Sequence, residues 1–240
     1  MSETGPKVAI VTGGSQGIGA GLVAGYRERN WAVVANSLHI GPSTDPDVLT
    51  VQGDISEQAT ADQIISQAMD RFGRIDTVIN NAGVFVAKPF TDYTAEDYAL
   101  VTGVNLAGFL WLTQRAIGQM LKQGSGHVVN ISASIADIAD IAEPTALAAL
   151  TKGALAAVTR SLAAEYASRG IRVNAVAPGI TQTPLQPAES YTPAALAGKL
   201  PPLGRAGQVS DVVNGILYLE SAPYVTGEIL RIDGGRTAGR

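Results

Sequence analysis

Seven short apolar runs alternate with helix-like segments along almost the whole chain of 240 residues. Most of these runs are unbroken, which is typical of strands buried on both faces of a parallel sheet. Strand–helix alternation of this kind predicts an α/β fold, a Rossmann-type doubly wound parallel sheet of about seven strands with helices on both faces. The expected strands are Val8–Val11, Ala32–Ala35, Val48–Val51, Thr77–Asn80, His127–Ile131, Arg172–Val176 and Ile229–Ile232.

Helical patterns fill most of the intervals, at Ile18–Arg29, Gln58–Phe72, Ala95–Leu121, Thr145–Ser168 and Val209–Leu219. Two intervals differ. Residues 36–49 contain Gly-Pro and Asp-Pro pairs, which favour a loop. Residues 179–208 are rich in proline, and long connections in compact domains tend to be lids or binding loops, so we expect a substrate-binding loop there. No polar linker interrupts the alternation, and we expect a single domain over residues 1–240.

Composition excludes several classes of function. The net charge of −4 is opposite in sign to that of typical nucleic-acid-binding proteins, and the sequence contains no polybasic membrane patch. The chain has no cysteine and two histidines, so disulfides and thiolate metal sites are excluded and a histidine-rich metal site is not expected. The first residues contain no apolar signal-peptide core, and no segment reaches the length of a membrane span. We therefore expect a cytoplasmic protein that binds no nucleic acid, membrane or metal.

A glycine-rich turn, Thr12–Gly19, directly follows the first expected strand. Glycine lets the backbone turn tightly and approach a ligand closely, and the start of the following helix offers unpaired N–H groups to a pyrophosphate. A lone turn of this composition is weak evidence, but its place in the first strand–helix unit strengthens it. The candidate phosphate-binding residues are Gly13, Ser15, Gln16, Gly17, Ile18 and Gly19.

Further motifs follow later strands in a fixed order. They are Asp54-Ile55, Asn80-Asn81-Ala82-Gly83, Asn105, Lys152, Pro178-Gly179 with Thr181 and Thr183, and Asp233-Gly234-Gly235. Together with the glycine turn, these residues resemble the short-chain dehydrogenase/reductase family over nearly the full length. The resemblance implies a nicotinamide cofactor and hydride transfer to or from a small carbonyl or alcohol. It also implies a homotetramer or homodimer.

The resemblance implies a role for each motif. Asp54, with Ile55 beside it, would hydrogen-bond the adenine edge, and Asn81, Ala82 and Gly83 would form a floor under the nicotinamide ribose. Lys152 would bind the ribose hydroxyls, and Thr183 would hold the carboxamide, flanked by Pro178, Gly179 and Thr181. Each of these residues, considered alone, also fits an ordinary turn or surface position.

The second strand ends in Asn36-Ser37-Leu38-His39, which bears on the choice of nucleotide. A carboxylate at this point would grip the ribose 2′-hydroxyl of NAD and repel the 2′-phosphate of NADP. None is present, and Asn36, Ser37 or His39 offers a donor to that phosphate, although no arginine or lysine accompanies them. This pattern favours NADP, with NAD left open.

The family's catalytic signature, a tyrosine four residues before the lysine, is absent. That spacing puts both side chains on one helix face, where the cation lowers the pKa of the phenol and lets it exchange a proton with the substrate. Here Ala148 stands four residues before Lys152, and no tyrosine lies between Tyr98 and Tyr166. A methyl group cannot donate a proton, so Ala148 is the central departure from the family pattern.

The catalytic serine of the family is also displaced. Ser134 is the preferred substrate-facing hydroxyl, and Ser132 stays open. Candidate replacements for the phenol are a water bound to Lys152, the Thr145 hydroxyl, Tyr191 from the loop, and a carboxyl group among Asp137, Asp140 and Glu143. Those three acids suggest a cationic substrate, and an iminium ion already carries its proton. Imine reduction is therefore a hypothesis beside carbonyl reduction.

The predicted catalytic set is Asn105, Ser134, Ala148 and Lys152. An atypical NAD(P)H-dependent oxidoreductase is the preferred interpretation. Two alternatives remain: a catalytically silent nucleotide-binding sensor or assembly protein, and a variant of an ordinary ketone reductase from which the tyrosine was removed. The leucines Leu185, Leu196 and Leu200, with Phe85 and Val86, indicate a hydrophobic substrate pocket and nothing narrower.

Overall fold

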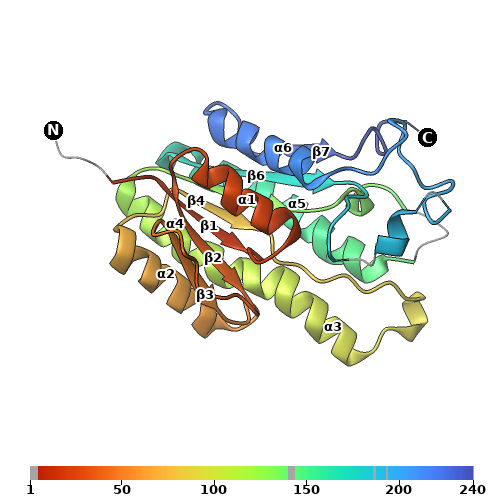
Figure 1. Cartoon of the computed structure of the whole chain (residues 1–240), viewed down its shortest axis with the longest axis horizontal. Coiled ribbons are helices and arrows are strands. Elements are labelled where there is room, and N and C mark those ends of the chain that lie inside the picture. The colour runs from red at the N-terminus through yellow and green to blue at the C-terminus, as the bar shows by residue number, and fades with distance from the viewer. Residues whose placement is uncertain (1–4, 140–143, 186–187, 193, 240) are drawn as a thin grey trace.

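A computed structural model describes residues 5–139, 144–185, 188–192 and 194–239. In this part of the chain, seven parallel strands form one sheet in the order β3-β2-β1-β4-β5-β6-β7 (Figure 1). The predicted doubly wound α/β fold is confirmed. The strands are β1 Val8–Thr12, β2 Ala32–Ser37, β3 Val48–Gln52, β4 Thr77–Asn80, β5 Gly126–Ile131, β6 Ile171–Pro178 and β7 Ile229–Ile232.

The strands form because their side chains are buried on both sides. All five residues of β1 are buried. Val8 and Ile10 belong to one hydrophobic core cluster, and Ala9 and Val11 belong to the other, as the alternation of side chains along a strand requires. The unbroken apolar runs of the sequence are therefore the consequence of a sheet covered on both faces.

Helices cover both faces of the sheet. Helices α1 and α6 pack together on one face, while α2, α4 and α5 cover the other (Figure 1). A bilayer-spanning helix, one both long and apolar enough, does not occur among the described residues. The helices are α1 Gly17–Arg27, α2 Gln58–Phe72, α3 Ala95–Thr102, α4 Gly108–Gln123, α5 Ala146–Tyr166 and α6 Val209–Ser221.

The helix expected over Ala95–Leu121 is divided in the structure. A π-helical turn, Gly103–Ala107, joins α3 to α4. Such turns are frequent at functional sites because the extra residue redirects one side chain. The turn buries Asn105, which is 2% exposed. The loop expected between the second and third strands is present, with no helix between Ser37 and Val48.

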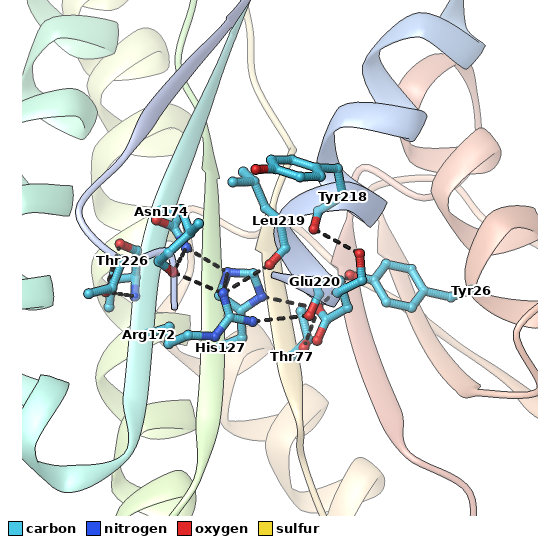
Figure 2. Close-up of polar contacts among 12 residues, drawn as sticks. Tyr26, Thr77, His127, Arg172, Asn174, Tyr218, Leu219, Glu220 and Thr226 are labelled. Carbon is cyan, nitrogen blue, oxygen red and sulfur yellow. Dashed lines mark hydrogen bonds and ion pairs between the residues drawn. The ribbon is translucent and has the colours of Figure 1, made fainter. Parts of the chain in front are cut away.

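A buried polar cluster lies at the amino ends of the central strands (Figure 2). Oε2 of Glu220, on α6, accepts hydrogen bonds from the Tyr26 hydroxyl at 3.0 Å and the Thr77 hydroxyl at 2.8 Å. It also lies 3.1 Å from Nδ1 of His127. These bonds join α1, β4 and β5 to the end of α6, on the edge of the sheet opposite the carboxyl ends of the strands.

The partners of His127 assign its tautomer. Its Nε2 faces two groups that only donate, the Asn174 amide nitrogen at 3.1 Å and the Arg172 guanidinium at 3.4 Å, so Nε2 is the acceptor and Nδ1 carries the proton. Burial lowers the pKa of His127, outweighing the raising effect of Glu220. Burial raises the pKa of Glu220, but hydrogen bonds from His127, Thr77 and Tyr26 hold it below its ordinary value. The cluster therefore favours neutral His127 and ionised Glu220.

Candidate active site

A cavity of about 850 Å³ lies along the carboxyl edge of the sheet. It is lined by the segments that follow β1 to β6 and by one face of α5. It crosses the point between β1 and β4 where the strand order reverses, which is where open α/β sheets bind ligands. The described residues of the 179–208 loop contribute one wall, at the end of the molecule where the C-terminus lies (Figure 1).

The glycine turn has a backbone that only glycine accommodates. Gly13 has φ +66°, in the left-handed region. A Cβ added at Gly19 would lie 2.0 Å from the carbonyl oxygen of Gly13. The turn thus brings β1 close to the start of α1, where the first N–H groups have no partner within the helix. This geometry suits the binding of a phosphate group at the N-terminus of α1.

Hydrogen bonds fasten the glycine turn to the end of β4. The Thr12 hydroxyl accepts bonds from the backbone N–H groups of Asn81 and Ala82, each at 3.0 Å. The Asn81 side chain donates to the Thr12 carbonyl at 2.8 Å. The predicted floor of small residues is thereby held against the turn, and Asn81, Ala82 and Gly83 all line the cavity.

The end of β2 offers a hydroxyl group rather than a charge. The Ser37 hydroxyl lies 2.9 Å from that of Ser15, and both residues line the cavity. The Asn36 side chain, also predicted as a ligand, is buried and donates to the carbonyls of Val51 at 3.0 Å and Gly53 at 3.2 Å. Asn36 therefore joins β2 to β3, and its amide hydrogens are already used. His39 does not line the cavity.

Asn105 acts as a clamp on the backbone of the segment that follows β4. Its side-chain oxygen accepts from the N–H of Val84 at 2.9 Å, and its side-chain nitrogen donates to the Val84 carbonyl at 3.1 Å. The same nitrogen lies 3.2 Å from the Thr151 hydroxyl on α5. Asn105 does not line the main cavity, so its contacts are those of a positioning residue rather than of a group that touches substrate.

Lys152 and Ala148 line the cavity from the same face of α5. The Lys152 ammonium donates to the Ile131 carbonyl at 2.7 Å. It makes no ion pair with a carboxylate of the described residues. Burial without a counter-charge lowers the pKa of Lys152 to about 8. Ala148 is 2% exposed and presents only a methyl group beside this cation.

The two candidate serines differ in their partners. The Ser132 hydroxyl donates to the carbonyl of Lys152 at 2.8 Å and so fastens α5 to the end of β5. The Ser134 hydroxyl is buried, lines the cavity and has no hydrogen-bond partner within the described chain. Buried polar groups normally have partners, so the Ser134 hydroxyl is able to bond a ligand or a water in the cavity.

The structure brings most of the predicted site residues together. The predicted catalytic set and the predicted nucleotide-binding residues all line the cavity, except Gly19, His39 and Asn105. Of the predicted apolar residues, Phe85, Leu185 and Leu196 line the cavity, whereas Val86 and Leu200 do not. Sequence reasoning missed other lining residues, among them Leu38, Lys199 and Arg236. Of these three, only Arg236 could have been predicted from the sequence, because it directly follows the Asp-Gly-Gly turn after β7.

The structure also narrows the candidate proton donors. Asp137 does not line the cavity and forms an ion pair of 2.9 Å with Arg231, so it is removed as a donor or as a charge facing substrate. Thr145 does not line the cavity either. Tyr191 lines it, but its hydroxyl donates to the carbonyl of Thr181 at 3.0 Å. Asp140 and Glu143 lie outside the described residues.

These features fit a dinucleotide. The glycine turn suits its phosphates and the small residues after β4 leave room for a sugar. The Lys152 ammonium bonds to the end of β5, and Ser134 follows the same strand, so both cavity-lining groups lie at the carboxyl end of β5. Asp54 stands on the far side, after the edge strand β3. The cavity is therefore long enough in outline to hold a nucleotide and a small second molecule.

Comparison with known proteins agrees with this geometry. The profile of the family described as enoyl-(acyl carrier protein) reductase matches residues 13–237. An uncharacterized oxidoreductase of Methylorubrum extorquens is 35% identical over an alignment of 255 positions, which covers 98% of this chain and 99% of the relative.

Two solved structures show the same fold with nucleotides bound. One is the 3-ketoacyl-(acyl-carrier-protein) reductase of Brucella melitensis complexed with NADH, 27% identical, with a TM-score of 0.86 and coverage of 96% of this chain and 98% of that one. The other is a gluconate 5-dehydrogenase of Burkholderia cenocepacia with NADP and tartrate, 28% identical, with a TM-score of 0.87 and coverage of 98% and 96%. The chain belongs to the short-chain dehydrogenase/reductase family of NAD(P)-dependent oxidoreductases.

Proposed function

We propose that this protein transfers hydride between NAD(P)H and a small hydrophobic carbonyl compound or its alcohol, with a proton donor other than tyrosine. One observation carries the proposal: buried Ala148 and half-buried Lys152 line the same cavity from one helix face. Tyrosine would stand at residue 148 in the family pattern. When bound, the nicotinamide ring supplies the hydride, and the protein has to supply a proton to the substrate oxygen.

Lys152 is the best-supported source of that proton, acting through a bound water. The truncated side chain of Ala148 leaves room for water beside the ammonium, and the lowered pKa of about 8 suits proton transfer near neutral pH. Ser134 would hold the substrate oxygen, since its buried hydroxyl has no partner among the described residues. Asn105 would keep the segment around Val84 in place through its two backbone bonds.

A neutral carbonyl substrate is favoured over an iminium ion. Among the described residues that line the cavity, the one carboxylate is Asp54, which belongs to the far end. A cationic imine would therefore have no described counter-charge near Lys152, and the ammonium itself would repel it. Imine reduction remains an outcome that the assay below would reveal.

NADP is the favoured nucleotide. The paired hydroxyl groups of Ser37 and Ser15 face the cavity at the end of β2, and no carboxylate stands there to repel a 2′-phosphate. Replacing Ser37→Asp should weaken NADPH binding by about tenfold or more while sparing NADH. Equal affinity of the variant for both nucleotides would count against this choice.

The protein would act in the cytoplasm as a homodimer or homotetramer. Leucines on two helices of one layer support assembly: Leu110 on α4 is 46% exposed and Leu150 on α5 is 56% exposed. Light scattering during size-exclusion chromatography tests this, and a monomer at micromolar concentration would contradict it.

The decisive assay combines a panel of ketones, aldehydes and cyclic imines with NADPH and NADH. Wild type should reduce at least one activated carbonyl compound, and Lys152→Met should lower kcat by about 10²-fold or more, the usual contribution of a positioned proton donor. Tight nucleotide binding with no turnover of any substrate would favour the silent sensor. Faster turnover of imines than of their ketone counterparts would favour the imine hypothesis.

A further inference from the structure

The space beside Ala148 has the properties of a small ligand site. Ala148 and Lys152 line the cavity one helical turn apart, and Gly83 lies close to the ammonium. A Cβ added at Gly83 would lie 3.2 Å from the Lys152 ammonium. The ammonium is therefore closely surrounded, while the helix surface one turn before it carries only a methyl group.

Two polar groups at this end of the cavity require a partner. The Ser134 hydroxyl has none in the described chain, and the Lys152 ammonium has one described acceptor, the Ile131 carbonyl. An ammonium carries three N–H groups, so it can donate to further acceptors. A ligand hydroxyl fits here because its oxygen accepts from a cation while its hydrogen stays available to another oxygen.

The remaining walls favour an apolar ligand. Phe85, Leu185 and Leu196 line the cavity, and pockets of this character bind apolar rings through a few placed polar groups. No described carboxylate lies near Lys152, so a hydroxyl that loses its proton here would face a cation and no competing anion. A phenol meets these requirements better than an aliphatic alcohol, because its proton is more acidic.

We infer that the preferred substrate is an aryl ketone or aldehyde with a phenolic hydroxyl beside the carbonyl group. This inference rests on the proposed function. The phenol of the substrate occupies the space next to Ala148 and gives its proton to the carbonyl oxygen. As hydride from the reduced nicotinamide nucleotide forms the new C–H bond, the carbonyl π pair moves to oxygen. The phenolic O–H bond then breaks and the alcohol O–H bond forms. The phenolate stays beside the Lys152 ammonium until water reprotonates it.

A matched pair of substrates tests this inference: ortho-hydroxyacetophenone and its methyl ether. Wild type should favour the phenol by about tenfold or more in kcat/KM, since a positioned general acid is worth at least that much. In Ala148→Tyr the protein fills the space and brings its own donor, so the preference should vanish or reverse. Ala148→Phe fills the same space without a donor and should be slow with both. An equal preference in wild type and Ala148→Tyr would overturn the inference.

Phenol itself provides a second readout that does not depend on turnover. Phenol should bind wild type in difference absorbance spectra, with partial ionisation near pH 8, and should not bind Ala148→Phe. Added phenol should also accelerate the reduction of plain acetophenone by wild type, and it should not change the rate of that reaction in Ala148→Phe. Equal binding to the two proteins, or no binding, would overturn the inference even if ketones are reduced. If no variant reduces any ketone, Ala148→Tyr included, the proposed function fails and the inference fails with it.

Discussion

Removing the side chain of Asn105 should destabilise the fold although this residue does not line the main cavity. In Asn105→Leu the size is nearly kept, but the N–H and the carbonyl of Val84 both lose their side-chain partner. A buried backbone group left without a partner costs about 1–3 kcal/mol, and Val84 is only partly buried, so we expect about 2–4 kcal/mol in total. Thr151 keeps the carbonyls of Leu147 and Ala148 as acceptors and adds nothing to this sum.

Urea unfolding monitored by circular dichroism measures this loss, and the matched control is Thr102→Ala. The Thr102 hydroxyl donates only to the Tyr98 carbonyl of its own helix, so the control should change the free energy of unfolding by about 0.5 kcal/mol or less. Nucleotide affinity should fall in Asn105→Leu as well, because the floor after β4 loosens. A loss in Asn105→Leu no larger than in the control would refute the role of Asn105 as a clamp.

Three further predictions follow from the geometry. Gly19→Ala should abolish nucleotide binding, because the added Cβ would lie 2.0 Å from the Gly13 carbonyl oxygen. The control Gly118→Ala lies on α4 with open space around it, so its free energy of unfolding should stay the same or rise by up to about 1 kcal/mol. Isothermal titration compares the nucleotide affinity of the two variants, and thermal melts compare their stability. Because burial depresses the pKa of His127, the unfolded chain binds a proton that the folded chain resists, so the free energy of unfolding should fall as the pH drops below about 6.5. Urea titrations at several pH values should show this slope in wild type and a flatter one in His127→Gln, and parallel slopes would contradict it. Lys152 loses its proton as the pH rises through its pKa of about 8, so kcat for reduction by wild type should decline over this range. In Lys152→Arg, kcat should stay level over the same range. Identical pH profiles of wild type and Lys152→Arg would be evidence against Lys152 as the proton source.

Much of the fold follows from local patterns in the sequence. The strands β4 and β7 and the helix α2 have the bounds that periodicity predicts, because each is an apolar or amphipathic segment closed by turn residues. The π-helical turn around Asn105 left no such trace, since its residues continue a helical pattern and the widening depends on packing against the rest of the chain. Helix bounds at α1 and α5 differ from the predicted ones by one or two residues, because hydrophobic periodicity does not fix the terminal residues of a helix.

The site was predictable as a set of strand ends, but the bonds of individual side chains were not. Asn36 lies at the correct edge of the sheet, yet its amide donates to two carbonyls, one in the neighbouring strand β3 and one just after it. Asp137 was expected near substrate because of its place in the chain, and Arg231 from β7 instead holds it. Both outcomes depend on residues distant in the sequence, which no local pattern contains. The same holds for the buried cluster around Glu220, which joins α1, β4 and β5 to the end of α6.

Isotope transfer tests the central claim most directly. NADPH deuterated at the transferable position of the nicotinamide ring is incubated with wild type and an aryl ketone, and the product is examined by mass spectrometry and NMR. We expect one deuterium at the carbinol carbon, with the hydroxyl proton drawn from water, although residue 148 carries no phenol. Bound NADPH that passes no deuterium to any carbonyl or imine carbon would contradict it.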